Sequence, residues 1–415
     1  MAQAFLEGLL LVLQWKPLAF MMLGVLLGFW VGLLPGLGGA TTLALMLPFI
    51  YTMQPVEAFA FLLGMHSVTA TTGDITAVLF GVPGEASSAA TILDGHAMAK
   101  KGEAGRALGA ALGSSLVGAI IGAFALALAV PIVRPLVLTF GSPELFMLAI
   151  VGLSFIAALS SQGGRGMLRG FLAGALGLFL ATVGQDPQAG VARYTLDTLY
   201  LWQGLDLVPV LVGIFAIPEI MDLVARGSSI AGNAPAEKLS QGAFEGLKDT
   251  FRHFWLTVRC SLIGTFIGVM PGMGGSVAQW MAYGHATQSA RNAEERNGFG
   301  AGDVRGVLGP GAANNSKEGG ALIPTIAFGV PGSTAMAILL GGFFLLGLVP
   351  GPDMLTKHLS LTFSMVWTIV IANIVTVLIC FVFLDRLANL TRVRGAVLIP
   401  VILVLVFIGS FTSNN

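Results

Sequence analysis

Two related stretches interrupt the long apolar runs of this 415-residue sequence: Leu34-Pro-Gly-Leu-Gly-Gly39 and Met270-Pro-Gly-Met-Gly-Gly275. A second pair repeats the arrangement, with Phe80-Gly-Val-Pro-Gly84 matched by Phe328-Gly-Val-Pro-Gly332. Proline removes an amide donor and glycine frees the backbone, so each stretch is expected to break a helix. Two matched pairs of breaks indicate one ancestral unit used twice.

The composition around these breaks is that of a membrane protein. Hydrophobic residues make up 55% of the chain and charged residues only 10%, whereas a soluble domain carries about 25% charged residues. Several uncharged runs are long enough to cross about 30 Å of hydrocarbon. The predicted spans are Leu18–Leu34, Ala107–Val133, Leu145–Ser161, Gly170–Gly184, Phe363–Leu384 and Gly395–Thr412.

These spans predict an all-α polytopic membrane protein built from two halves. We expect an N-terminal interfacial segment at 1–17, a first repeat half at 18–224, a hydrophilic linker at 225–253 and a second half at 254–415. The linker and the loop at 385–394 are rich in Lys and Arg, which predicts that both are cytoplasmic.

Several function classes are excluded or disfavoured by the sequence. The net charge is zero, so nothing suggests a nucleic-acid partner, and Cys260 and Cys380 lie in apolar segments as expected of buried thiols. No P-loop, Cys/His metal motif or Ser/His/Asp arrangement is found, so we do not expect an enzyme. A TVGYG-type filter is also absent, which disfavours a potassium channel.

The first break is either a packed kink or part of a binding site. Broken backbone is tolerated in lipid only where protein buries it or where it lines a cavity. The matching break in the second half favours the interpretation as a binding site. Its candidate substrate ligands are Pro35, Gly36, Gly38 and Gly39, and its candidate cation ligands are Thr41 and Thr42, either of which could instead cap a helix.

A threonine-rich patch after this break contains Asp74. A carboxylate at membrane depth is a candidate functional group, so Asp74 and Thr76 are predicted cation ligands. The alternative is that Asp74 caps a helix at a water interface. The nearby His66 is interpreted as a packing histidine.

The second break is followed by small hydroxyl residues. They are typical of a helix start whose free amides face an anion, so Gly84, Glu85, Ser87 and Ser88 are predicted to contact substrate. Glu85 has an alternative role, which is to complement the positive end of the helix dipole.

The second half contains an insertion of about a dozen residues within 285–317, interpreted as polar and ending at 309–318. Asn314 and Asn315 then occupy the place of the first half's threonine-rich patch, and their amides suit a carboxylate or a cation. Gly332 and Ser333 complete the predicted substrate site. Three roles are open for Lys317: it pairs with an anionic substrate, it pairs with Glu318, or it lies in water.

Matched halves with broken helices at corresponding positions are typical of secondary transporters. Five motifs, in the same order, resemble the large membrane subunit of tripartite tricarboxylate transporters, the TctA family. They are Gly32-Leu-Leu-Pro-Gly-Leu-Gly-Gly39, Phe80-Gly-Val-Pro-Gly-Glu-Ala-Ser-Ser88, Leu93-Asp-Gly-His-Ala-Met-Ala99, Gly309-Pro-Gly-Ala-Ala-Asn-Asn315 and Phe328-Gly-Val-Pro-Gly332.

The resemblance implies a multi-pass permease of the bacterial inner membrane that imports a carboxylate such as citrate by cation symport, usually with Na⁺. It also implies a small four-helix membrane subunit, a periplasmic substrate-binding protein and elevator-type motion of two repeats, which we expect to be inverted. The resemblance leaves open whether the protein is a homodimer. We expect no cofactor besides the coupling ion. The alternative function is a passive anion channel or pore-forming subunit.

Two features depart from the family pattern. Members usually continue for several helices beyond a Ser-x-Asn-Asn-like stretch, here Ser413-Asn-Asn415, so we expect a truncated or short variant without the family's C-terminal helices. Thr72-Gly-Asp-Ile-Thr76 replaces a Gly-Ser-Thr-Thr-like run, so Asp74 leaves the identity of the substrate open.

Overall fold

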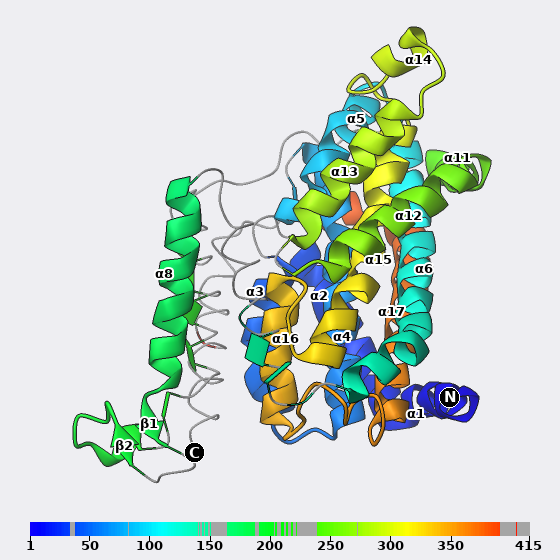
Figure 1. The fold of residues 1–415 in the computed structure, drawn as a ribbon. Helices are drawn as coiled ribbons and strands as arrows, with labels where there is room; N and C mark the ends of the chain where they lie inside the picture. Colours follow the sequence, from blue (N-terminus) through cyan, green and yellow to red (C-terminus); the bar gives the residue numbers. More distant parts are fainter. Residues whose placement is uncertain are drawn as a thin grey trace.

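A computed structural model describes residues 1–33, 38–81, 83–139, 164–186, 191–202, 239–271 and 273–390, with short pieces between 141 and 221 and at 404. Most of the described residues are helical (Figure 1). The α-helices are α1 Ala2–Leu13, α2 Trp15–Gly32, α3 Gly39–Met46, α4 Pro55–Phe80, α5 Ala89–Lys100, α6 Ala104–Leu138, α8 Gly164–Ala181, α11 Leu239–Arg252, α12 Phe254–Val269, α13 Gly274–Gln288, α14 Ala293–Asn297, α15 Arg305–Phe328, α16 Thr334–Leu345 and α17 Leu359–Leu390.

Short elements complete the described chain. The 3-10 turns are Leu47–Ile50, Ala86–Ser88 and Leu199–Leu201. Strands β1 (Gly184–Gln185) and β2 (Ala192–Arg193) form a small antiparallel ribbon that follows α8. In Figure 1, α8 and this ribbon lie to one side of the main helical bundle.

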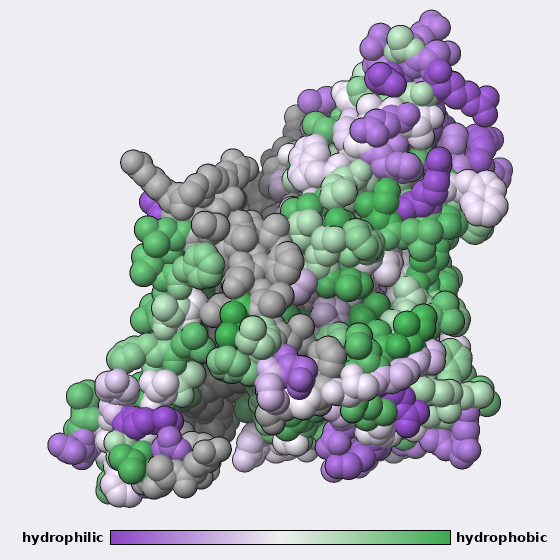
Figure 2. Space-filling view, viewed as in Figure 1, coloured by the Kyte–Doolittle hydropathy of each residue, from purple (hydrophilic) through white to green (hydrophobic). Residues whose placement is uncertain are grey.

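Three described helices are long and apolar enough to cross a membrane: Trp15–Gly32, Ala104–Leu138 and Leu359–Arg386. The outer face of α6 exposes Leu128, Ile132 and Leu136, which are large apolar side chains suited to contact with lipid. Figure 2 shows an apolar band across this face of the bundle, with polar residues gathered at its two ends. The chain is therefore a multi-pass membrane protein.

The predicted spans agree with these helices where the structure describes them. Leu18–Leu34 corresponds to α2, Ala107–Val133 to α6 and Phe363–Leu384 to α17, whereas Gly170–Gly184 overlaps α8 and runs into β1. The predicted spans at 145–161 and 395–412 lie almost wholly outside the described residues.

The two Phe-Gly-Val-Pro-Gly motifs end their helices in the same way. Helix α4 ends at Gly81 with φ 65° and ψ 21°, and α15 ends at Gly329 with φ 67° and ψ 19°. This left-handed conformation is easily reached only without a Cβ atom, and the following proline cannot continue the helix. The predicted breaks are therefore present at both positions.

Small residues let the preceding helix of each half lie close to these long helices. A Cβ atom on Gly28 of α2 would overlap the Met65 carbonyl oxygen of α4. A Cβ atom on Gly264 of α12 would lie 2.7 Å from the Ala313 oxygen of α15. Contacts of this kind pack helices tightly where lipid supplies no hydrophobic driving force.

The polar connection of the second half ends earlier in the chain than the sequence predicted. Residues 309–318 do not end it; they form the buried interior of α15. The polar connection runs instead from Ser289 to Val304 around α14. Glycines explain the difference, because Gly311 packs against Ser114 of α6 and Gly309 against Ala282 of α13, so this stretch is enclosed by neighbouring helices.

The described parts of the two segments predicted to be cytoplasmic lie together. Ser240, in α11, donates its backbone N–H and its hydroxyl to Asp385 at 3.0 and 2.8 Å. Ser360, at the other end of α17, donates to Glu7 of α1 at 2.7 Å. Helix α17 therefore runs from the end that carries α1 to the end that carries α11 (Figure 1).

Candidate functional site

Helices α4 and α15 meet through a ladder of buried polar contacts. His66 Nε2 lies 2.9 Å from Glu318 Oε2, and Asn314 donates from Nδ2 to the Ala70 carbonyl oxygen at 2.9 Å. Residue numbers rise on one helix as they fall on the other, so the helices are antiparallel here. These contacts join segments from the two halves of the chain.

A charged cluster is formed by His66, Glu85, Lys317 and Glu318. Lys317 donates to the Glu318 carboxylate, and Glu318 is only 3% exposed. Because a carboxylate can only accept, His66 Nε2 carries the proton in its contact with Glu318. Buried charges without partners are costly, so this pairing stabilises all three groups.

The breaks of both halves lie directly against this cluster. His66 Nδ1 has no hydrogen-bond partner and lies 2.5 Å from the position of a Cβ atom on Gly39. A Cβ atom on Gly275 would overlap Lys317 Cε and lie 2.9 Å from Ser87 Cβ. The start of α3 therefore faces the histidine, and the start of α13 faces the lysine.

Glu85 places a carboxylate at the start of α3. Its Oε2 accepts the Gly39 N–H at 3.3 Å, and the Ser87 hydroxyl donates to Oε1. Gly38, the N-cap residue of α3, lies beside the same side chain. The first amides of a helix favour negative charge, which explains why a carboxylate is held here.

An oxygen cluster lies next to the charged cluster and consists of Asp74, Ser88, Thr91 and Asn314. Asn314 Nδ2 lies 3.5 Å from Asp74 Oδ2, and the Ser88 and Thr91 hydroxyls lie beside the same carboxylate. One oxygen of each residue forms no hydrogen bond of normal geometry: Asp74 Oδ1, Ser88 Oγ, Thr91 Oγ1 and Asn314 Oδ1. Carboxylate, hydroxyl and amide oxygens gathered at one buried place suit a cation.

Asp74 itself is not a helix cap. It lies well inside α4 and is 1% exposed, so the alternative of a cap at a water interface is wrong. Among the described ion pairs none includes Asp74. Glu85 repels the Asp74 carboxylate and attracts the Lys317 ammonium group. The two clusters together hold three acidic side chains beside one lysine and one histidine.

Asn315 belongs to a separate polar network on another face of α15. Its Nδ2 donates to Thr71 Oγ1 at 2.7 Å and to Asn373 Oδ1 at 2.6 Å. Thr71 also lies 3.4 Å from Ser115 Oγ, so α4, α6, α15 and α17 are joined at this point. This network ties the long helices together and is distinct from the charged and oxygen clusters.

Other predicted site residues make local contacts. The Ser333 hydroxyl caps α16 by accepting the Met336 N–H at 3.3 Å, and Gly332 packs against the Gly268 oxygen. The remaining placements are Thr42 donating to the Gly38 oxygen at 3.1 Å, Thr76 donating to the Gly73 oxygen at 3.0 Å, Gly84 donating its N–H to the Gly73 oxygen at 3.3 Å, and Thr41 buried in the first turn of α3. Pro35 and Gly36 lie outside the described residues.

Sequence reasoning underestimated or missed three residues of these clusters. His66 was interpreted as packing, Glu318 only as an alternative partner for Lys317, and Thr91 was not considered. The usable signal was the pair Lys317-Glu318 directly before an apolar run, because adjacent charges at membrane depth need partners. Thr91 carries no such signal in the sequence.

The Leu93-Asp-Gly-His96 motif anchors the polar connection of the second half. Asp94 is fully buried, and its Oδ1 accepts the backbone N–H groups of Gly300, Gly302 and Asp303 at 2.8–2.9 Å. Its Oδ2 accepts the Tyr283 hydroxyl at 3.0 Å. A structural role at the α5 end of the bundle therefore accounts for this motif.

Among the described residues, no group of three or more His, Cys, Asp and Glu side chains has the geometry to hold a metal ion. The oxygen cluster instead combines one carboxylate with hydroxyl and amide oxygens. Such neutral oxygens suit a hard monovalent cation better than a transition metal, which prefers nitrogen and sulfur ligands.

The comparisons with known proteins agree with the motifs. Residues 18–415 match the family described as "Tripartite tricarboxylate transporter TctA family". The chain is 33% identical over 392 residues to an Agrobacterium vitis protein named "Uncharacterized 52.8 kDa protein in TAR-I ttuC' 3'region", covering 94% of this chain and 76% of the relative. A second A. vitis protein, "Uncharacterized protein in TAR-II ttuC' 3'region", is 30% identical over 152 residues, 37% of this chain and 62% of that protein.

No solved structure matches the chain. The family match covers nearly the whole sequence, and the first relative aligns over most of both chains. The family is one of transporters and not of enzymes. The chain therefore belongs to the TctA family and is a subunit of a tripartite tricarboxylate transporter.

Proposed function

We propose that this chain is the permease of a secondary active transporter that imports a small di- or tricarboxylate, such as citrate, together with Na⁺. The observation that carries the proposal is the buried charged cluster at the point where the interrupted helices of both halves meet. Charged residues at membrane depth are expensive and mark substrate and ion pathways.

The matched contacts support two inverted repeats. The spacing from Phe80 to Phe328 is 248 positions, which relates His66 to Asn314 and Ala70 to Glu318. The contact between His66 and Glu318 thus corresponds to the contact between Asn314 and Ala70. An exchange of this kind between antiparallel helices is what a pseudo-two-fold axis in the membrane plane would produce.

Lys317 is the proposed cationic contact for the substrate. It lies against the start of α13 and near Ser87 of the second break, so a carboxylate there would meet an ammonium group, a hydroxyl and free helix amides. Glu85 already occupies the equivalent environment at the start of α3. A substrate carboxylate would compete with Glu318 for Lys317, which couples binding to a change in the charged cluster.

The oxygen cluster is the proposed coupling-ion site. A Na⁺ ion held by Asp74, Ser88, Thr91 and Asn314 would stabilise the ionised Asp74 carboxylate beside Glu85. It would also favour binding of an anion nearby, because opposite charges attract strongly where water is excluded. Thr41, Thr42 and Thr76 are not joined to Asp74 by any hydrogen bond of the described residues.

The chain would act in the bacterial inner membrane with a small four-helix subunit and a periplasmic substrate-binding protein, and a homodimer is compatible with this arrangement. Basic residues of the described chain gather at the end that carries α5, α11 and α14, which we place in the cytoplasm. The binding protein would then dock at the opposite end, near α1. Elevator-type movement of the repeats would expose the site alternately.

The test is uptake of labelled di- and tricarboxylates into cells that express the chain with its partner subunits, with and without a Na⁺ gradient. We expect Na⁺-dependent accumulation that Lys317→Met abolishes, while Lys248→Met, at an exposed lysine of α11, leaves it unchanged. Accumulation beyond electrochemical equilibrium excludes a passive channel. Unchanged uptake in Lys317→Met cells would remove the charged cluster from the substrate path.

A further inference from the structure

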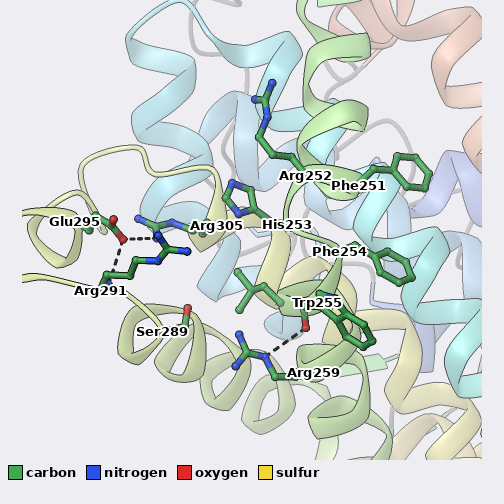
Figure 3. Close-up of a pocket in the computed structure, with 11 residues that line it drawn as sticks. Phe251, Arg252, His253, Phe254, Trp255, Arg259, Ser289, Arg291, Glu295 and Arg305 are labelled. Atoms are coloured by element: carbon green, nitrogen blue, oxygen red, sulfur yellow. Dashed lines mark hydrogen bonds and ion pairs between the residues drawn. The ribbon is translucent and has the colours of Figure 1, made fainter.

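A basic pocket of about 580 Å³ opens at the end of the bundle that carries α11 and α14. It is bounded by the end of α11, the start of α12, the connection from α13 to α14 and the start of α15. Its charged lining consists of Arg252, His253, Arg259, Arg291, Glu295 and Arg305 (Figure 3). Four arginines thus face a space that holds a single carboxylate.

Two of these arginines are neutralised by protein groups. Arg252 pairs with Asp249 at 2.7 Å, and Arg305 pairs with Asp303 at 2.7 Å and Glu295 at 2.9 Å. Arg259 Nε donates only to the Trp255 carbonyl oxygen at 3.3 Å, and the Arg291 backbone N–H donates to Glu295 at 3.2 Å. Among the described ion pairs, neither the Arg259 nor the Arg291 guanidinium takes part.

Aromatic side chains form the rim of the same pocket. Trp255 is 76% exposed and Phe251 is 62% exposed, and Phe254 lies between them in the sequence (Figure 3). An exposed Trp beside arginine is typical of the membrane–water interface, where the indole ring lies at the level of the headgroups. The pocket therefore lies where a lipid headgroup would meet the protein.

We propose that this pocket binds the phosphate of an anionic phospholipid from the cytoplasmic leaflet. The guanidinium groups of Arg259 and Arg291 would hold the phosphate, since arginine matches phosphate oxygens with paired N–H donors. The acyl chains would leave over Trp255 and Phe254 into the bilayer. A free inorganic anion would use the same arginines but would gain nothing from the apolar rim.

His253 adds a second feature to the lining. Its burial, and next the Arg305 guanidinium, lower the pKa of His253, so the imidazole is neutral in the unliganded pocket at neutral pH. The positive charge offered to a ligand therefore comes from the arginines. A neutral histidine contributes a hydrogen-bonding group to the headgroup site without repelling the neighbouring arginines.

The experiment is lipid binding to the purified full chain in detergent, measured by native mass spectrometry with phosphatidylglycerol, phosphatidylcholine and inorganic phosphate as separate probes. We expect phosphatidylglycerol to be retained in preference to phosphatidylcholine. The double variant Arg259→Ala/Arg291→Ala should weaken that binding about tenfold or more. The control Lys248→Ala removes a basic residue of α11 that lies outside the pocket lining, and it should have no such effect.

Three results would overturn the proposal. If phosphatidylcholine is retained as well as phosphatidylglycerol, the arginines do not select for the negative charge of the headgroup. Displacement of phosphatidylglycerol by millimolar phosphate would identify a free anion as the ligand. Unchanged binding in the double variant would place the lipid elsewhere. The variant Arg259→Lys/Arg291→Lys keeps the charge, so retained lipid binding there shows that loss in the alanine variant is not a folding defect.

Discussion

His66 Nε2 lies 2.9 Å from Glu318 Oε2, and both side chains are buried although they are 252 positions apart in the sequence. This contact ties the long interrupted helix of the first half to that of the second. Lys317 shares the Glu318 carboxylate, so one acidic group holds two basic ones. Loss of any member would leave a charge or a donor buried without a partner.

Glu318→Gln should therefore destabilise the protein by about 3 kcal/mol or more, as expected when one partner of a buried ion pair is removed. The amide cannot balance the Lys317 charge. The thermal midpoint in detergent measures the effect. The double variant His66→Ala/Glu318→Gln should lose less than the sum of the two single variants, because the two residues contact each other. Strict additivity would argue against the contact.

Asp74→Asn should remove the dependence of stability on Na⁺. A ligand that binds only the folded state raises its stability with concentration, so the thermal midpoint of the unchanged protein should rise with NaCl but not with choline chloride. The variant should not respond to either salt. Asp353→Asn is the matched control, because Asp353 is an exposed carboxylate paired with Lys357 at 3.0 Å. An equal NaCl response in both variants would exclude the oxygen cluster as the cation site.

Gly275→Ala should impair transport, and because the new methyl group would lie 2.9 Å from Ser87 Cβ, the thermal midpoint is measured beside uptake. The new methyl group would overlap the far end of the flexible Lys317 side chain and push its ammonium group aside. Gly284→Ala lies in the same helix, where nothing lies within 4 Å of the new Cβ atom. That control should keep full uptake and gain about 0.5–1 kcal/mol from the higher helix propensity of alanine. Equal uptake by the two variants would contradict the proposed role of Lys317.

Asp94→Ala should release the connection between α14 and α15. Three backbone N–H groups and one hydroxyl lose their acceptor, and each donor left unpaired and buried costs about 1–3 kcal/mol. We expect faster proteolysis and faster hydrogen exchange at 298–304, measured by mass spectrometry. Asp353→Ala serves again as the comparison. An unchanged exchange rate in this segment would mean that other contacts hold it.

Acidification should destabilise the α11–α12 junction through His253. The pKa of His253 is lowered by burial and then by Arg305, with Arg252, Asp249 and Asp303 as the other charged neighbours. The unfolded chain therefore takes up a proton first as the pH falls below 6.5, so stability is complete above that value and is lost as the pH falls toward the lowered pKa. His253→Gln should reduce the dependence of the thermal midpoint on pH between pH 6.5 and 5. If the thermal midpoint changes equally with pH in the unchanged protein and the variant, another group causes the pH dependence.

Much of this architecture follows from local sequence. The two Phe-Gly-Val-Pro-Gly motifs determine where α4 and α15 end, because only glycine readily adopts the left-handed conformation and proline cannot continue the helix. Apolar runs without charges likewise predict α2, α6 and α17, since lipid requires backbone groups to be paired within each helix. The extent of α15 could not be read in this way, because residues 309–318 look like a polar turn until neighbouring helices enclose them.

The membrane class and the breaks after α4 and α15 were predicted by the sequence alone, which left Asp74 as either a functional carboxylate at membrane depth or a helix cap. The tertiary structure decided which groups meet: it paired His66 with Glu318, separated Asn314 from Asn315 onto different faces of α15, and brought Thr91 beside Asp74. Local patterns fix helices because their hydrogen bonds join near neighbours. Contacts between distant residues depend instead on how two antiparallel helices align, and that alignment is set by packing along their whole length.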